Sequence, residues 1–178
     1  TREFDFKLPN VSSITVDPHK MGLAPIPSGG ILFRDRALLK DIGVKIPYLT
    51  GGETEQSTIV GTRSGASAIA VWALMNHLGR EGYKAIVSRC MNLTWKLVEE
   101  IEKIDGLSLV TKPMMNIVGI KSEETDIRLI AQRLRDKGWA ISLFPKHFRV
   151  IVMPHTKLVH IQNFLKDLRE ISKTLSVK

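Results

Sequence analysis

The spacing of hydrophobic and polar residues changes several times along the chain, and its first part predicts strands joined by turns. Small polar and β-branched residues alternate over residues 12–16, which is typical of a short, half-buried strand. A turn rich in glycine and proline follows over residues 21–30, and residues 31–33 predict a second strand. Glycine, proline, serine and threonine are frequent over residues 36–60, where we expect an irregular segment with at most a short helix at residues 37–42.

Two helices are predicted in the middle of the chain. The first begins near Ser64, and because residues 66–75 are apolar on almost every side we expect it to be buried. Gly79 and Gly82 interrupt this helix. The second helix is closed by Gly106, and its apolar residues recur at helical spacing at Leu93, Leu97, Val98, Ile101 and Ile104.

The last part of the chain has the pattern of a compact α+β unit. Strands are predicted at residues 107–111, 116–121, 141–143 and 148–153. A helix with Gly138 as its cap follows the second strand, and a last helix follows Thr156, which we expect to cap it. The apolar faces of these helices consist of Ile127, Ile130, Ala131 and Leu134, and of Ile161, Leu165, Leu168, Ile171 and Leu175. We place the domain boundary near residues 80–90.

The composition is that of a globular protein, with 43% hydrophobic and 25% charged residues. Its richest apolar stretch, residues 66–75, is too short for a membrane helix, so we expect no membrane partner. The single cysteine, Cys90, rules out an internal disulfide framework and favours a cytoplasmic location. The five histidines show no close ligand pairing, so we expect no metal site.

The net charge of +8 is compatible with binding to nucleic acid. However, lysines and arginines are mixed with acidic residues, as over residues 166–170, and aromatic residues make up only 6% of the chain. No basic block is interleaved with aromatic side chains. We therefore interpret most of the charge as a solvated surface and expect no nucleic-acid partner.

The tetrapeptide Asp17-Pro18-His19-Lys20 carries the strongest candidate chemistry. Pro18 prevents a helix, so Lys20 leaves the end of a strand on a fixed turn. Such a lysine is either a solvated surface residue or an amine that attaches a cofactor, and the residues alone leave both interpretations open. The segment Gly61-Thr62-Arg63-Ser64-Gly65 is similarly either an anion site at a helix start or a capped turn.

These motifs together resemble those of a known family. Residues 13–20, followed by Pro27-Ser28-Gly29-Gly30 and by residues 61–66, resemble the pyridoxal-phosphate-dependent group II amino acid decarboxylases. The sequence looks most similar to the archaeal L-tyrosine/L-aspartate decarboxylase branch, with sphingosine-phosphate lyase as a cousin. The resemblance implies the α/β fold of type I pyridoxal-phosphate enzymes. Residues 1–85 would be the C-terminal part of the large cofactor-binding domain, and residues 86–178 the small α+β C-terminal domain.

The resemblance also implies roles for residues around the cofactor, pyridoxal 5'-phosphate. Lys20 would hold the cofactor aldehyde as an imine and release it to the substrate amine. His19 would donate a hydrogen bond to the cofactor phosphate or move a proton, although a purely structural role in the turn is equally compatible with its position. Asp17 would accept a backbone amide or support the phosphate network.

Further residues are assigned in the same way. Thr62 would contact the cofactor of the neighbouring subunit in a homodimer whose cofactor sites are shared, and Arg63 would be a structural or interface cation. Arg149, in the strand at residues 148–153, would orient a substrate carboxylate, unless it lies on a solvent-facing side of that strand. The chain would be the C-terminal half of an enzyme, whose N-terminal half supplies the group stacked on the cofactor ring and the acid that pairs with its nitrogen.

We therefore expect decarboxylation of an L-amino acid of the tyrosine, aspartate or glutamate class, with the isolated chain inactive. One alternative is a carbon–carbon lyase of the sphingosine-phosphate-lyase type, which would share Lys20 and the Gly-Thr-Arg segment. The other is a non-catalytic basic α/β module that binds nucleic acid or another protein.

Overall fold

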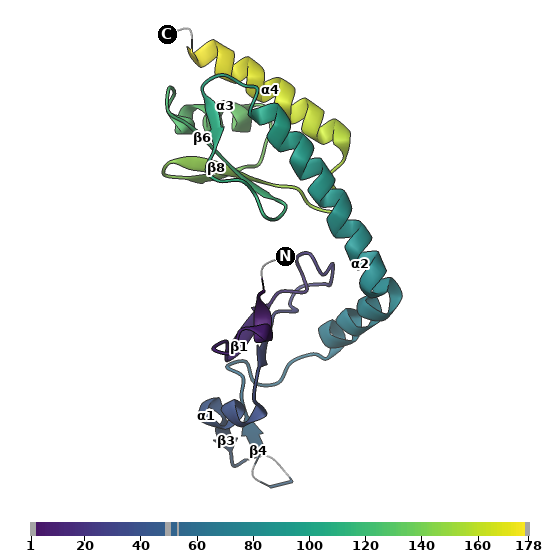
Figure 1. Ribbon diagram of the computed structural model, residues 1–178. Coiled ribbons are helices and arrows are strands. Elements are labelled where there is room, and N and C mark those ends of the chain that lie inside the picture. Colours follow the sequence, from purple (N-terminus) through teal and green to yellow (C-terminus); the bar gives the residue numbers. More distant parts are fainter. Residues whose placement is uncertain (1–2, 49–50, 53, 177–178) are drawn as a thin grey trace. The chain divides into compact units, whose positions relative to one another are not determined.

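The computed structural model describes residues 3–48, 51–52 and 54–176 of the chain (Figure 1). The backbone divides into two compact units, residues 1–80 and 81–178. Helix α2 (Ala66–Ile101) begins in the first unit and ends in the second. Gly79 has the non-helical angles φ 56° and ψ −170°, which confirms the predicted interruption at this glycine. The helix continues through Gly82, so the second predicted interruption is wrong.

Two small β-hairpins form much of the first unit. Strand β1 (Ser13–Val16) pairs with β2 (Gly30–Phe33), which confirms both predicted strands. Strand β1 is more exposed than expected, with only Ile14 partly buried. Strands β3 (Val44–Ile46) and β4 (Thr54–Gln56) form the second hairpin. The short helices of this unit are η1 (Asp5–Lys7), η2 (Arg36–Leu38) and α1 (Leu39–Ile42).

The second hairpin contradicts the prediction of an irregular segment over residues 36–60 that holds at most a short helix. Its strands have three residues each, which is too few for an alternating pattern to stand out from the surrounding glycines and threonines. The short helix within this segment was predicted correctly, since η2 and α1 together span residues 36–42.

The expectation of a buried helix over residues 66–75 is also wrong for this chain. Ile69, Trp72 and Met75 are 67%, 66% and 60% exposed. They are spaced three residues apart, so they form one stripe along α2. An apolar pattern shows that a surface favours burial, but it does not identify the polypeptide that buries it.

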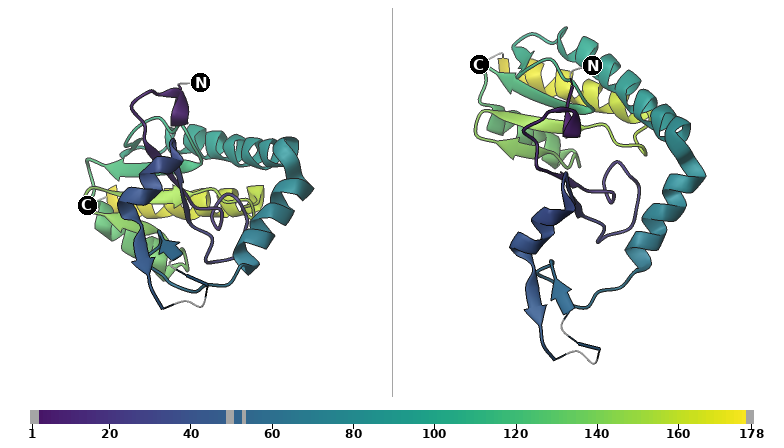
Figure 2. Two further views of the ribbon diagram at one scale, coloured as in Figure 1. Left: turned by 90° about the horizontal axis from the view of Figure 1, so that it is seen from below. Right: turned by 60° about the horizontal axis from the view of Figure 1, so that its bottom comes forward.

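The second unit contains a four-stranded antiparallel sheet in the order β5-β6-β8-β7. Its elements are β5 (Leu107–Leu109), β6 (Ile117–Ser122), α3 (Ile127–Asp136), β7 (Ser142–Phe144), β8 (His147–Ile151) and α4 (Leu158–Ser176). Every strand and helix predicted here is present, with ends that differ by a few residues. Within this unit, Figures 1 and 2 show α4 lying beside the C-terminal part of α2. Glu100 of α2 forms an ion pair with Arg169 of α4.

The core of this unit lies between one face of the sheet and the helices. Buried positions alternate along β6, at Val118 and Ile120, as expected of a strand with one covered face. The core is completed by side chains from the three helices and β8, including Leu97, Ile101, Ile130, Leu134, Phe148 and Leu168. Among the described residues, no helix combines the length and the apolar character needed to cross a membrane.

The ends of two helices test the predicted caps. Gly138 has φ 90°, and the N–H groups of Gly138 and Trp139 donate to the carbonyls of Arg135 and Leu134 at 2.8 and 3.0 Å. This is a Schellman motif, so the predicted glycine cap of α3 is confirmed.

The predicted cap of α4 is wrong. The Thr156 hydroxyl accepts the Met153 amide at 3.0 Å, and the Lys157 amide donates to His160 Nδ1 at 3.3 Å. The Thr156 side chain therefore bonds to the segment before the helix, and His160 accepts the N–H of Lys157 at the helix start.

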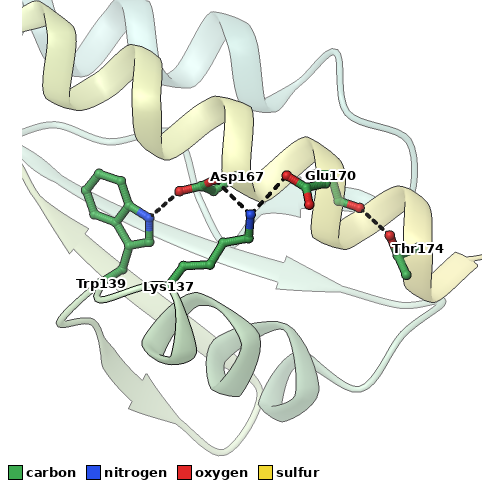
Figure 3. A network of polar contacts seen from close by, with 5 residues as sticks. All are labelled: Lys137, Trp139, Asp167, Glu170 and Thr174. Atoms are coloured by element: carbon green, nitrogen blue, oxygen red, sulfur yellow. Dashed lines mark hydrogen bonds and ion pairs between the residues drawn. The ribbon is translucent and has the colours of Figure 1, made fainter.

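A polar network fixes the connection between α3 and β7 onto α4 (Figure 3). Lys137 Nζ lies 3.1 Å from Asp167 Oδ1 and 2.9 Å from Glu170 Oε2. Trp139 Nε1 donates to Asp167 Oδ2 at 2.8 Å, and its ring meets the ring of Phe164 edge to face, with 5.3 Å between the centroids. The indole is thus held at both its polar and its apolar side.

Candidate functional site

Lys20 lies on a tight turn that begins where β1 ends. The Lys20 amide donates to the Asp17 carbonyl at 3.0 Å, and the Ala24 amide donates back to the Pro18 carbonyl at 3.0 Å. A Cβ atom at Gly22 would lie 2.6 Å from the Pro18 oxygen, so only glycine fits where the chain passes over Pro18. The sequence prediction of a fixed turn at this place is confirmed.

The side chain of Lys20 forms an ion pair within this turn. Its Nζ lies 2.7 Å from Asp17 Oδ2, and the two side chains are 67% and 43% exposed. The hydrogen bond from Lys20 is the main reason why the pKa of Asp17 lies below its ordinary value. The charges of Lys20 and His19 lower this pKa further, whereas partial desolvation raises it. Asp17 is therefore ionised at neutral pH.

The segment before β2 packs against the same turn. A Cβ atom at Gly29 would lie 3.1 Å from Asp17 Oδ1 and 3.9 Å from His19 Cε1, so the chain passes close to both residues. In the described part of the chain, His19 Nδ1 and Ser28 Oγ are buried without a hydrogen-bond partner. Buried polar atoms are normally paired, so these two atoms, one in the residue next to Lys20 and one in the residue next to Gly29, are free to bind a ligand.

Ser28 was not assigned a role in the sequence analysis, although it lies within the Pro-Ser-Gly-Gly motif that contributed to the resemblance. Its burial and its place next to Gly29, which packs against His19, depend on how the segment before β2 folds back. A motif read residue by residue gives no information on either property.

The Gly-Thr-Arg-Ser-Gly segment forms a capped loop ahead of α2. Ser64 Oγ accepts the Ala66 amide at 3.1 Å, which caps the helix start. Arg63 Nη1 donates to Thr58 Oγ1 and to the Gly61 carbonyl, both at 3.1 Å, so this arginine stabilises the loop from within. Thr62 is exposed on this loop.

Arg149 belongs to the second unit, whereas Lys20 belongs to the first. It lies on β8, paired with Gly119 of β6 and Ser142 of β7. Its guanidinium carbon lies 5.4 Å from the ring centroid of Phe144, and this ring stacks on His147 with 4.7 Å between the centroids. Arg149 Nε is buried and, among the described residues, has no hydrogen-bond partner.

Arg149 also lines a cavity of about 360 Å³, together with Trp139, Ser142, His155, Thr156 and His160. A half-buried guanidinium beside a cavity, with one N–H left unpaired, is suited to bind an anionic group such as a carboxylate. His160 both accepts a hydrogen bond from the Lys157 amide and lines this cavity. In the described residues no cluster of His, Cys, Asp and Glu side chains is arranged to hold a metal ion.

Comparison with known proteins establishes the family. The model of the pyridoxal-dependent decarboxylase conserved domain matches residues 1–122. This chain belongs to that family, as the sequence motifs indicated. The cofactor of the family is pyridoxal phosphate, as those motifs implied. The match includes the Lys20 turn, Ser28 and the loop with Thr62, whereas Arg149 lies beyond its end.

Individual relatives agree with this assignment. The chain is 48% identical over 173 residues to an L-aspartate decarboxylase of Thermococcus kodakarensis. The aligned region covers 97% of this chain and 44% of that protein. It is 52% identical over 171 residues to a probable L-tyrosine/L-aspartate decarboxylase of Methanothermobacter thermautotrophicus. Here the aligned region covers 95% of this chain and 46% of that protein. The chain thus spans less than half the length of these relatives.

A solved structure confirms the fold class. The sphingosine-1-phosphate lyase of Burkholderia pseudomallei superposes with a TM-score of 0.88 at 28% identity, over 98% of this chain and 40% of that one. The predicted α/β fold of type I pyridoxal-phosphate enzymes is therefore correct.

Proposed function

We propose that this chain is part of a pyridoxal-phosphate-dependent decarboxylase of L-amino acids and that Lys20 attaches the cofactor. One observation carries the proposal. The Lys20 amine stands on a fixed turn that includes the buried, unpaired His19 Nδ1, and the adjoining segment with the unpaired Ser28 Oγ packs against this turn, all inside the part that matches the family. A structural lysine would need no such neighbours.

The residues of the turn fit the cofactor's phosphate and aldehyde. When bound, the cofactor supplies an aldehyde that bonds to an amine and a ring that withdraws electrons from the substrate's Cα. Lys20 supplies the amine, which must lose its proton before it bonds. His19 Nδ1 and Ser28 Oγ are free to hydrogen-bond to the phosphate. Asp17 lies in the same turn as His19, with Oδ2 2.7 Å from Lys20 Nζ.

Arg149 is proposed to bind a carboxylate of the substrate. A decarboxylase gains nothing from clamping the carboxylate that it must release as carbon dioxide, because tight binding of the ground state opposes its loss. Arg149 therefore suits a distal carboxylate, as in aspartate or glutamate. The relative from Thermococcus kodakarensis, an L-aspartate decarboxylase by name, supports this substrate class.

The whole enzyme is proposed to be a cytoplasmic homodimer in which Thr62 reaches the cofactor of the neighbouring subunit. Residues 1–85 would complete the large domain together with an N-terminal half, and residues 86–178 would form the small domain. The stripe of Ile69, Trp72 and Met75 supports an obligatory partner, because three large apolar side chains exposed in a row favour burial.

A carbon–carbon lyase is the second candidate, and the TM-score of 0.88 with a sphingosine-1-phosphate lyase supports it. The two candidates differ in their products. A decarboxylase releases carbon dioxide and an amine, whereas a lyase of this kind releases an aldehyde from a phosphorylated amino alcohol. The higher identity to decarboxylases, 48% against 28%, favours the first.

The deciding experiment uses the whole enzyme with its cofactor. Borohydride reduction followed by peptide mapping is expected to place a pyridoxyl group on Lys20. Lys20→Arg keeps the positive charge and should abolish both the visible absorbance and the adduct, while the matched control Lys7→Arg should keep both. An adduct on another lysine, or none after cofactor is added, would refute the proposal. The absence of an adduct would revive the non-catalytic basic module.

A further inference from the structure

Asp17 and Lys20 are brought together by the same backbone turn. The Lys20 amide bonds to the Asp17 carbonyl at 3.0 Å, and the two side chains meet at 2.7 Å. Asp17 Oδ1 faces Gly29, where a Cβ atom would lie at only 3.1 Å, so Oδ2 is the oxygen turned toward Lys20. The contact is therefore built into the fold of the turn.

From this geometry we infer that Asp17 is the counter-ion that holds the Lys20 ammonium group in the cofactor-free enzyme, so that cofactor attachment must break this ion pair. The inference rests on the proposed role of Lys20. The charged or titratable groups that act on Asp17 in the described residues are Lys20 and His19 alone, and the segment that packs against it contributes the uncharged Ser28 and Gly29.

The ion pair has a chemical consequence for attachment. The Lys20 nitrogen bonds to the aldehyde carbon through its lone pair, which is available only after the ammonium group has given one proton to the solvent. The aldehyde oxygen then leaves as water with the two remaining nitrogen protons. The 2.7 Å ion pair between Lys20 Nζ and Asp17 Oδ2 must therefore break before the nitrogen can bond.

A positioning role follows for Asp17. While the cofactor is absent, the pair keeps the amine at the start of the turn and lowers its reactivity toward other electrophiles. His19 and Ser28 would hold the cofactor phosphate, and Lys20 would give up the ion pair for the bond to the aldehyde. Because the pair is exposed, its strength is modest, and cofactor attachment remains possible at neutral pH.

The inference can be tested on the cofactor-free whole enzyme by labelling its amines with trace acetic anhydride over a range of pH, with peptide mass spectrometry as the readout. Asp17→Asn should raise the labelling rate of Lys20 at neutral pH about two- to fivefold, the range expected for an exposed ion pair. Asp17→Glu, which keeps a carboxylate, should restore most of the wild-type profile.

The chain offers a matched control in a second exposed ion pair. Lys121 Nζ lies 2.8 Å from Glu123 Oε1 in the second unit. Glu123→Gln should raise the labelling of Lys121 and leave that of Lys20 unchanged. Conversely, Asp17→Asn should leave the labelling rate of Lys121 unchanged. A general loosening of the protein would affect both lysines in either variant, so this pair of results separates a local charge effect from unfolding.

A salt series on the wild-type enzyme provides a test that needs no folded variant. Added salt screens an exposed ion pair, so Lys20 labelling should increase with salt in the wild type. If neither salt nor Asp17→Asn changes Lys20 labelling, the inference is overturned, even where the pyridoxyl adduct forms normally. If the adduct does not form on wild-type Lys20, the proposed function fails, while labelling still reports on the ion pair.

Discussion

Trp139 Nε1 donates a hydrogen bond to Asp167 Oδ2 at 2.8 Å, and this bond fixes one wall of the cavity that Arg149 lines. The donor lies just before β7 and the acceptor lies on α4, so the contact fastens the edge of the sheet to its covering helix (Figure 3). It is the main reason why the pKa of Asp167 lies below its ordinary value, with Lys137 contributing further.

The first prediction concerns the pH dependence of stability. Because the folded state lowers the pKa of Asp167, this carboxylate stabilises the fold above its unfolded pKa of about 4, and the stabilisation is lost as the pH falls through the folded value. Asp167→Asn should therefore destabilise the enzyme at neutral pH and flatten its acid unfolding curve. Denaturant titrations at several pH values measure both effects.

Trp139→Phe isolates the hydrogen bond within the same network. We expect the free energy of unfolding to fall by about 1 kcal/mol, because Asp167 keeps Lys137 as a partner. Trp95→Phe is the control, since it keeps an aromatic ring beneath Lys112, whose Nζ lies 5.9 Å from the Trp95 ring centroid. Equal losses in the two variants would contradict the role of the Asp167 bond.

The second prediction concerns Arg149 and the substrate. Arg149→Lys keeps the positive charge but loses the planar fork, so the KM for an acidic amino acid should rise about 10- to 100-fold with a smaller change in kcat. Steady-state kinetics of the whole enzyme on L-aspartate and L-tyrosine measure this effect. The rise should be larger for aspartate if the guanidinium binds the distal carboxylate.

Arg128→Lys is the control for this variant, because Arg128 forms only a surface ion pair with Asp126 in the described structure. An unchanged KM in Arg149→Lys would remove Arg149 from the substrate site. An equal rise of KM for both substrates would keep Arg149 in the substrate site, but as a contact to the α-carboxylate that both amino acids share.

The third prediction concerns the Lys20 turn. Gly22→Ala places a Cβ atom 2.6 Å from the Pro18 oxygen, so the turn must open and lose its bonds. We expect a loss of about 1–3 kcal/mol in unfolding free energy and a marked fall in cofactor content. Gly30→Ala is the matched control on β2, where the nearest atom to an added Cβ lies at 4.0 Å. Cofactor absorbance and thermal unfolding distinguish the two variants.

Local sequence patterns predicted the Lys20 turn well, because Pro18, the preceding strand and the following glycines all act within a few residues of one another. The surroundings of Arg149 were not predictable in the same way. Phe144 meets His147 through the register of β7 and β8, and the cavity also needs side chains from α4. Register and helix packing depend on the whole unit, so Arg149 was identified only by its order in the chain.

The stripe on α2 supports the last prediction, which compares the isolated chain with the whole enzyme. Trp72 is 66% exposed in the described structure, whereas Trp95 and Trp139 are partly buried. The fluorescence of Trp72 is the component that is lost in Trp72→Phe, and in the isolated chain iodide should quench this component. The isolated chain should also show no decarboxylation. In the whole enzyme that component should be protected, because a long apolar stripe favours a covering partner. Equal quenching in both proteins would mean that α2 stays uncovered, and the proposed large domain would then need another arrangement.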